Sequence, residues 1–420
     1  MSNLFRIMIL LYLDLSGEKI TTIENVLVLQ GGGSLGAFGC GVYKALVKHN
    51  LDLDLIAGTS IGGINAAIIA GSRNKDRTDQ ILEEFWIELS ESFVNKDKFF
   101  GFSSSNLMKQ FYENFVYPIH KSDTTTSYVE MKKGQQIKIK QLESFFSSAA
   151  FGNKKFFKPR WFREYTISDP EYFTPMKWTY LYDHQPLIKT LERYIDYDKL
   201  RPGENSNPRL ILTAVSVLDS KALIFDSFKQ QIEPKHILAT SAYPLYNFPW
   251  IEVDKGVFAW DGGLLSNTPL REVLDASPIM DKKIFLVENY PKEVDALPGN
   301  IAEVHHRARD IIFSDKTEHN ITMSGVITRY LDFIEELYQI FEDNADKLQL
   351  DNHILSRIRR KYKKYHEDHG AEIKEIYHFS RNELFPHIFE NADFSPDTIK
   401  ELIRAGEDKA NKVIQAHKQE

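Results

Sequence analysis

The chain has 420 residues, of which 42% are hydrophobic and 26% are charged, the composition of a folded globular protein rather than a disordered one. Its net charge of −7, from 52 basic and 59 acidic residues, argues against a protein built mainly to hold nucleic acid. The single cysteine, Cys40, excludes a disulfide framework and a cysteine-rich zinc site. At roughly 150 residues per domain, this length predicts two or three units.

The N-terminal segment, residues 1–24, contains one apolar run from Ile7 to Leu13. This run is far shorter than the roughly 18 to 20 residues of a membrane span. It also lacks the basic start and the small-residue cleavage site of a secretory signal. We expect an edge strand or a docking segment here, with a membrane-touching N-terminus as the alternative. The sequence therefore favours a cytoplasmic protein, free or peripherally bound to a membrane, and leaves delivery to another cell open.

Strands and helices alternate from Glu24 onward. The run Val26–Leu29 predicts a strand buried on both faces, and the segment after Gly36 carries apolar residues at helical spacing. Such alternation with short loops predicts a mainly parallel sheet covered by helices, which is an α/β/α sandwich. Further strands are predicted at 51–56, 210–215, 222–225, 257–260 and 284–287, and helices at 61–70 and 187–194.

Two regions depart from this alternation. Residues 90–178 form an insert rich in aromatic side chains, and within it residues 131–163 carry nine basic residues against one acidic residue. A lid or an interfacial membrane surface would suit this composition, and so would a helical subdomain with a core of its own. From residue 321 to residue 420 the pattern is helical, with one apolar stripe made by Tyr330, Ile334, Leu337 and Phe341.

A G-x-S-x-G sequence, Gly58-Thr59-Ser60-Ile61-Gly62, lies between a predicted strand and a predicted helix. This is the setting of a nucleophile elbow, in which the serine occupies a sharp, strained turn and its neighbours must be small. The amides at the beginning of the following helix point to the same place and favour an oxyanion. The pattern therefore identifies Ser60 as the candidate nucleophile.

A glycine-rich segment, Gly31-Gly32-Gly33-Ser34-Leu35-Gly36, precedes the first predicted helix. It fits G-x-G-x-x-G, which together with Asp52 or Asp54 would suggest dinucleotide binding, and it contains a second G-x-S-x-G. Three consecutive glycines suit another task better, because unhindered amides of Gly32 and Gly33 could converge on a developing oxyanion. We therefore expect an oxyanion hole formed by Gly31, Gly32, Gly33 and Gly36.

The third motif, Asp261-Gly262-Gly263, ends a predicted strand. An aspartate followed by two glycines is by itself an ordinary turn. Its meaning changes here because a glycine-rich loop and a serine elbow precede it in the same sheet. Since functional groups gather at the carboxyl ends of the strands in open α/β sheets, we expect all three motifs to meet at one edge.

In this order the three motifs resemble those of the patatin-like phospholipase family. The resemblance extends to Ser241-Ala242-Tyr243-Pro244 and to Ser266-Asn267-Thr268-Pro269-Leu270, and it covers about residues 25 to 290 with gaps. The segment Ile403-Arg404-Ala405-Gly406 is similar to the C-terminal extension of one bacterial branch. The resemblance implies a patatin-like sandwich, with a catalytic domain over 25–320, the insert at 90–178 and a helical C-terminal region over 321–420.

The activity implied by the resemblance is that of a calcium-independent lipid acyl hydrolase of the phospholipase A or lysophospholipase type. A dyad of Ser60 and Asp261 would form and hydrolyse an acyl-enzyme, without a metal or a cofactor. Desolvation in a closed cleft would raise the pKa of Asp261 enough for proton transfer. Many family members carry Arg or Lys where this sequence has Leu35, so a positive charge for an anionic head group would have to come from elsewhere.

Other functions stay open at this point. His305 and His306 follow Asp261 and could complete a Ser-Asp-His triad, although their setting predicts a polar helix surface. The same dyad could instead transfer the acyl group to another alcohol, or the fold could serve as a non-catalytic lipid-binding or partner-binding module. The expected partners are a phospholipid or lysophospholipid and a membrane surface, with a protein activator left open and no nucleic acid. The basic run 357–364 predicts a solvated helix face or attraction to anionic lipid.

Overall fold

The computed structural model describes residues 23–91, 151–161, 172–204, 207–276, 280–294, 296–299, 301–314, 317–348, 350–367, 371–382 and 390–418. The N-terminal run at 7–13 and most of the aromatic and basic insert lie outside these residues, so the expectations for both stay predictions. No helix in the described ranges is both long enough and apolar enough to cross a membrane.

The centre of the molecule is an eight-stranded sheet with the order β10-β9-β1-β2-β5-β8-β7, and β6 pairs with β5 beside this path. The strands from β10 to β5 are parallel, whereas β6, β7 and β8 pair antiparallel. The mainly parallel sheet predicted from the sequence is therefore confirmed. Its strands are β1 (Glu24–Leu29), β2 (Leu55–Thr59), β5 (Arg209–Ser216), β6 (Ala222–Asp226), β7 (Ile251–Asp254), β8 (Val257–Asp261), β9 (Lys282–Glu288) and β10 (Ile373–Ser380).

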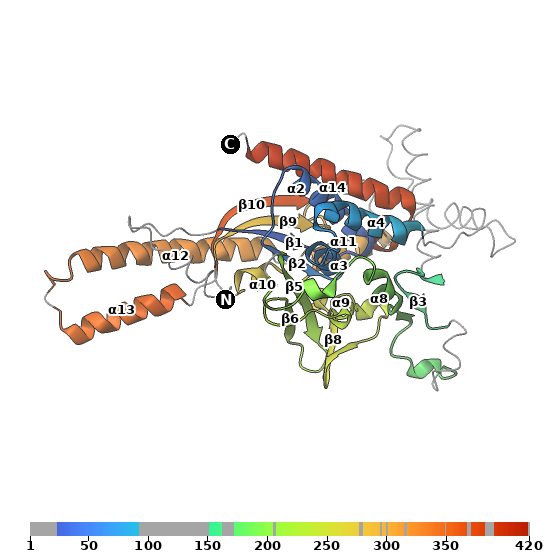
Figure 1. Ribbon diagram of the computed structural model, residues 1–420, viewed down its shortest axis with the longest axis horizontal. Coiled ribbons are helices and arrows are strands. Elements are labelled where there is room, and N and C mark those ends of the chain that lie inside the picture. The colour runs from blue at the N-terminus through green and yellow to red at the C-terminus, as the bar shows by residue number, and fades with distance from the viewer. Residues whose placement is uncertain are drawn as a thin grey trace.

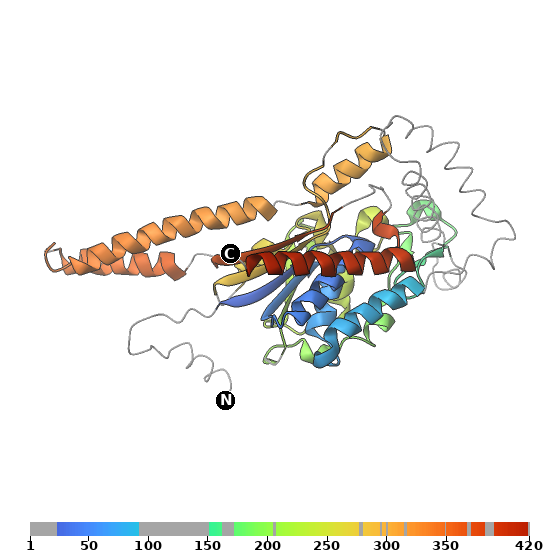
Figure 2. The same ribbon diagram turned by 90° about the horizontal axis from the view of Figure 1, so that it is seen from above.

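Alternate residues of each strand point to opposite faces of the sheet, and helices bury both faces. Leu27 and Leu29 belong to a large apolar cluster shared with α2, α3, α4 and α14, and Figure 2 shows α14 lying across this face. Val26 and Val28 point the other way, into a second cluster with α10. This gives the predicted three-layer α/β/α sandwich. The helices are α2 (Gly36–Lys48), α3 (Ile61–Ala70), α4 (Thr78–Glu91), α8 (Pro186–Leu191), α9 (Pro234–Thr240), α10 (Leu270–Leu274), α11 (Ile301–Phe313) and α14 (Pro396–His417).

A helical hairpin of α12 (Thr317–Asp343) and α13 (Asn352–Glu367) projects from the sandwich (Figures 1 and 2). The first residues of α12 anchor it, since α12 contacts α10 and β10 and Ile321 packs on the second cluster. The two helices of the hairpin join through stacked rings of Tyr338 and Tyr362 and through the ion pair of Arg359 with Glu342 at 2.8 Å. Large apolar side chains of α12 face solvent: Met323, Ile327, Tyr330, Phe333, Ile334, Leu337 and Ile340.

The C-terminal region contains more than the predicted helices. β10 forms the edge strand next to β9, and its Tyr377 and Phe379 are buried in the large cluster. β7 was not predicted either, and β2 begins at Leu55, four residues later than expected. β10 is difficult to recognise in the sequence because it alternates and is mostly polar. One side of an edge strand faces solvent, so such a strand needs few apolar residues. A separate antiparallel pair joins β3 (Lys158–Pro159), which lies in the insert region, to β4 (Tyr182–Asp183), which follows the insert.

Candidate active site

Ser60 occupies the sharp turn between β2 and α3. Its backbone has φ 57° and ψ −128°, a left-handed conformation that non-glycine residues rarely adopt. The turn is possible because Gly58 and Gly62, which lie two residues before and after Ser60, lack side chains. A Cβ on Gly58 would lie 2.3 Å from the backbone of Gly62, and a Cβ on Gly62 would lie 2.3 Å from the carbonyl oxygen of Leu29. The Ser60 amide donates to Thr240 Oγ1 at 3.1 Å, which fixes the turn to α9.

The two residues that flank Ser60 tie the elbow to the rest of the site. The Thr59 hydroxyl pairs with the Thr213 hydroxyl at 2.7 Å and donates to the carbonyl oxygen of Ser266 at 3.2 Å. Ile61 packs against Gly36 so closely that a Cβ there would lie 2.8 Å from its Cγ1. The elbow is therefore held by β5 on one side and by the beginning of α2 on the other.

Asp261 reaches the same edge of the sheet from an antiparallel strand. β8 overlaps β5 only at its last residues, with Asp261 opposite Ala214, so the end of β8 lies beside the carboxyl end of β5. The side chain is buried, and its Oδ1 accepts a hydrogen bond from the Gly263 amide at 2.7 Å. Gly262 packs on Thr213, because a Cβ there would lie 2.5 Å from the threonine Oγ1. A close contact thus requires glycine at position 262.

Burial raises the pKa of Asp261 from its ordinary value of 3.8 to about 7, while the Ser60 hydroxyl and the Gly263 amide act in the opposite direction. Ser60 therefore lies within interaction range of this carboxyl group. No described residue gives Oδ2 a hydrogen bond of standard geometry, so the contact of the Ser60 hydroxyl is not well aligned. One oxygen is thus bound by the Gly263 amide, and the other has no hydrogen-bond partner among the described residues.

Gly31 brings the glycine-rich loop against the nucleophile. A Cβ on Gly31 would lie 3.1 Å from the Cβ of Ser60 and 2.3 Å from Asn267 Oδ1. Asn267 also contacts the aspartate motif, since a Cβ on Gly263 would lie 3.2 Å from the same oxygen. The Asn267 side-chain amide donates to the carbonyl oxygen of Phe313 at 3.1 Å. This buried asparagine therefore sets the spacing between the glycine loop and Asp261, a role that the sequence alone did not indicate.

The amides of the loop differ in what they already bind. Gly31 N donates to the Asn267 carbonyl oxygen at 3.1 Å, and Gly36 N donates to the carbonyls of Gly33 and Ser34. Gly32 N and Gly33 N, by contrast, donate to no backbone carbonyl in the described part of the chain. Gly33 has φ +60°, which favours glycine. Of the four glycines expected to form an oxyanion hole, Gly32 and Gly33 are those with amides available for it.

Leu35 is buried among aromatic rings. It forms a small apolar cluster with Tyr243, Tyr290 and Phe313, which come from three other segments. A charged side chain at this position would lose its hydration inside that cluster. The leucine therefore fits its surroundings here.

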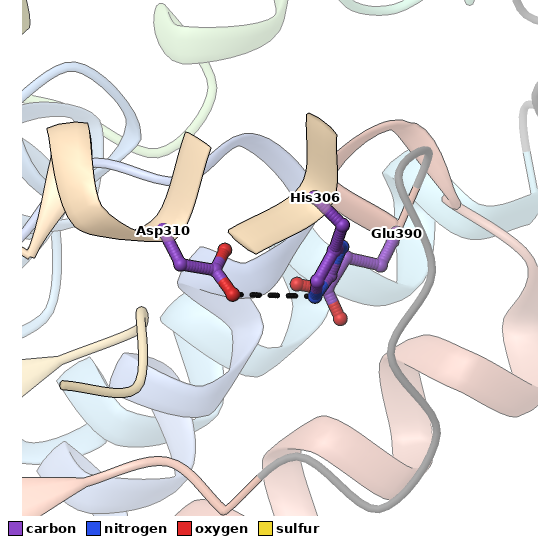
Figure 3. A group of neighbouring side chains, drawn as sticks. All are labelled: His306, Asp310 and Glu390. Atoms are coloured by element: carbon purple, nitrogen blue, oxygen red, sulfur yellow. Dashed lines mark ion pairs between the residues drawn. The ribbon is translucent and has the colours of Figure 1, made fainter. Parts of the chain in front are cut away.

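A separate polar cluster is formed by His306, Asp310 and Glu390 (Figure 3). Their ligand-type atoms are all within 4.8 Å of one another, a spacing compatible with a metal ion. Arg309 already occupies it, because its Nη2 lies 2.7 Å from Asp310 Oδ1, 2.8 Å from Glu390 Oε1 and 3.1 Å from His306 Nδ1. A guanidinium thus provides the positive charge that these groups require.

The two neighbouring histidines have different environments. His305 is exposed, whereas His306 is buried and lies 3.2 Å from Asp310 Oδ2 through its Nε2. The predicted polar helix surface therefore includes His305 and does not include His306. The sequence does not indicate that His306 is buried, because its acidic neighbour Glu390 comes from a distant part of the chain.

Several known proteins are similar to short parts of this chain. The chain is 43% identical over 63 residues to triacylglycerol lipase SDP1L of Arabidopsis thaliana and 44% identical over 59 residues to patatin-like phospholipase domain-containing protein 6 of Mus musculus. These matches cover 15% and 14% of this chain and only 8% and 4% of the relatives, so the chain spans a small part of their length. Lysophospholipase NTE1 of Debaryomyces hansenii is 47% identical over 57 residues, 13% of this chain and 4% of that protein.

Among solved structures, VipD from Legionella pneumophila matches 96% of this chain and 69% of its own, with 14% identity and a TM-score of 0.36. The ExoU–SpcU complex from Pseudomonas aeruginosa matches 68% of this chain and 47% of its own, with 17% identity and a TM-score of 0.24. The family model described as patatin-like phospholipase matches residues 27–274, which is more than half of the sequence. The chain therefore belongs to the patatin-like phospholipase family.

Proposed function

We propose that this protein hydrolyses carboxylic esters of lipids with a catalytic dyad of Ser60 and Asp261. The observation that carries the proposal is the buried Asp261 carboxyl, whose pKa is raised to about 7, within interaction range of a serine on a strained elbow. A base with a pKa near neutrality suits proton transfer at physiological pH. The glycine-loop amides of Gly32 and Gly33 supply the third element, donors for an oxyanion.

The reaction would pass through an acyl-enzyme. Ser60 Oγ forms a bond to the ester carbonyl carbon as its proton moves to Asp261 Oδ2, and the carbonyl oxygen becomes an oxyanion held by Gly32 N and Gly33 N. The carbon–oxygen bond to the leaving alcohol then breaks as that alcohol takes the proton from Asp261. In the second half, Asp261 accepts a proton from water, which attacks the acyl carbon, and Ser60 regains its proton when the fatty acid leaves.

The surroundings of the two histidines support a dyad rather than a triad. His306 accepts from Arg309 and pairs with Asp310, and His305 faces solvent on α11. Neither contact involves Ser60 or Asp261. Transfer of the acyl group to an alcohol other than water uses the same intermediate and stays a second candidate reaction.

We propose a phospholipid or lysophospholipid substrate, taken from a membrane surface to which the protein binds peripherally. Family membership supports the lipid, and the projecting hairpin supports the surface. The exposed apolar side chains of α12 are large enough to enter the interfacial region of a bilayer, and the basic run 357–364 on the adjacent α13 suits anionic head groups. We further propose that the catalytic domain over 25–320 and the C-terminal region over 321–420 act as one functional unit.

Labelling with a fluorophosphonate tests the proposal. We expect rapid labelling of the full chain, loss of labelling in Ser60→Ala, and normal labelling in the control Ser90→Ala, whose hydroxyl is bonded within α4. Analysis of lipids released from mixed vesicles by the wild type and by Ser60→Ala then identifies the ester that is cleaved. Folded wild-type protein that is neither labelled nor active on any lipid ester would instead support a non-catalytic binding module.

A further inference from the structure

The short segment Glu390–Ala392 presses directly on the glycine-rich loop. A Cβ on Gly33 would lie 2.1 Å from the carbonyl oxygen of Asn391, so the two backbones touch. The buried Ser34 hydroxyl donates to the carbonyl oxygen of Glu390 at 2.7 Å. The two residues that follow Gly32 are therefore held by a segment more than 350 positions away in the sequence.

Two arginines hold that segment in place. Glu390 Oε1 accepts hydrogen bonds from Arg309 Nη2 at 2.8 Å and from Arg381 Nη2 at 2.9 Å. All three side chains are largely buried. Arg309 also pairs with Asp310 at 2.7 Å, so two carboxylates balance two guanidinium groups. Charge-assisted hydrogen bonds of this kind, shielded from water, have a defined geometry.

Arg381 also connects this arrangement to the start of the loop. Its Nε donates to the carbonyl oxygen of Asn289 at 2.7 Å, and the Asn289 side-chain amide donates to the carbonyls of Gln30 and Gly31 at 3.0 and 3.1 Å. The loop is thus held on both sides of Gly32. We call Arg309, Arg381 and Glu390 the arginine clamp.

We propose that the arginine clamp, with Glu390 at its centre, positions the amides of Gly32 and Gly33 for the oxyanion. This inference rests on the proposed hydrolase function. Three consecutive glycines have the greatest backbone freedom of any tripeptide, so their amides need external support to keep one orientation. Oxyanion stabilisation depends on donors that are already oriented before the reaction. The family match ends at residue 274, and every residue of the arginine clamp comes after it. Residues outside the matched region therefore support the site.

Glu390→Gln tests this role, since it keeps the side-chain volume and removes the charge shared by two arginines. We expect kcat on a soluble short-chain p-nitrophenyl ester to fall by about 10- to 100-fold, because oxyanion donors act mainly in the transition state. KM should change by less than about two-fold, and the midpoint of the pH profile should stay in place because Asp261 keeps its contacts. Glu401→Gln, which breaks the exposed pair with Arg404, is the matched control and should behave as wild type.

Ser34→Ala gives a second, milder probe, because it removes only the hydroxyl that bonds to the Glu390 backbone. We expect a smaller loss of kcat with a modest decrease in unfolding temperature, since the Glu390 carbonyl loses its donor. When the two substitutions are combined, the loss of kcat should be less than the product of the single effects, because both loosen the same segment. This variant decides the question if Glu390→Gln does not fold. The proposal is overturned if folded variants keep kcat within two-fold of wild type, or if KM and the pH midpoint shift instead. Those outcomes differ from failure of the hydrolase proposal, in which wild-type protein itself is unlabelled and inactive.

Discussion

Asp261 faces two opposite requirements. As the proposed base it must be a carboxylate to accept the proton of Ser60, and it is buried where a charge is costly. The Gly263 amide and the Ser60 hydroxyl stabilise the charged form, but burial is the larger effect and raises the pKa to about 7. A carboxylate with this pKa is a better base than one near 4, and it is still ionised in about half of the molecules at neutral pH.

The rate should therefore follow the ionisation of Asp261. We expect kcat/KM for an uncharged ester to increase with pH through a midpoint near 7 and to level off above about pH 8, because the active base form exists above the pKa. A pH profile with a substrate that does not titrate measures this. A profile that is flat between about pH 5 and 9 would contradict the assignment of Asp261 as the base.

The same pKa predicts a stability cost. The native state holds the Asp261 proton up to about pH 7, whereas an unfolded chain releases it near 3.8, so stability decreases as pH rises between these values. Asp261→Asn removes the cost. We expect this variant to be inactive, yet more stable than wild type by up to about 4 kcal/mol at pH 8, with no difference below about pH 4. Urea unfolding at both pH values measures it, and the exposed Asp408→Asn, which should show neither effect, is the control.

Sequence reasoning at the residue scale worked where a motif is local. Gly58, Ser60 and Gly62 lie within five residues of the chain, so the sequence itself shows the small residues that a tight turn requires. Asn267 and Thr240 contact the same site from other elements. The segment of Asn267 contributes to the family resemblance, but the sequence assigns no role to either residue. Their roles depend on packing between segments, which a single sequence does not display.

At the scale of elements, α2 and α14 approach each other through glycines. A Cβ on Gly41 would lie 1.8 Å from the carbonyl oxygen of Ile403, and one on Gly406 would lie 2.1 Å from that of Phe38. The two helix backbones are therefore in direct contact. The similarity of Ile403–Gly406 to a bacterial C-terminal extension thus has a physical explanation, since this segment docks on the helix that follows the glycine loop.

Gly406→Ala should separate these helices. We expect it to lower the free energy of unfolding by about 2 to 3 kcal/mol, because the added methyl group has no room against the backbone of α2. Gly325→Ala is the matched control: its nearest neighbour is 3.9 Å away, so the better helix propensity of alanine should raise stability by about 1 kcal/mol. Equal effects of the two substitutions in urea unfolding would show that the close contact does not matter.

Across the whole molecule, the sequence predicted the strands and helices up to about residue 290 better than those after it. Buried parallel strands such as β1 and β9 are continuous apolar runs, which are easy to recognise. β10 reads as a mixed polar segment, and its pairing with β9 joins residues about 90 positions apart. The C-terminal region therefore looks independent in the sequence, although it completes the sheet, covers α2 and supports the glycine loop.

The hairpin gives the molecule one extended surface outside the sandwich, and its chemistry suits an anionic bilayer. The exposed face of α13 carries Arg360, Lys361 and Lys364 in a chain with a net charge of −7, so positive charge is concentrated there. We expect the triple substitution of these residues by glutamate to weaken binding to vesicles rich in anionic lipid by at least about 100-fold, at roughly 1 kcal/mol for each lost charge. Co-sedimentation at low and high salt measures this.

A change confined to the surface should leave the chemistry intact. The triple variant should therefore hydrolyse a soluble short-chain ester at the wild-type rate while losing activity on anionic vesicles, because only delivery of the lipid is affected. The matched control places the same charge changes at Lys400, Lys412 and Lys418, exposed on and just after α14, and should bind vesicles nearly as wild type does. If both triple variants lose binding equally, overall charge rather than the hairpin drives the attraction. If neither loses it, the bilayer contacts another part of the chain.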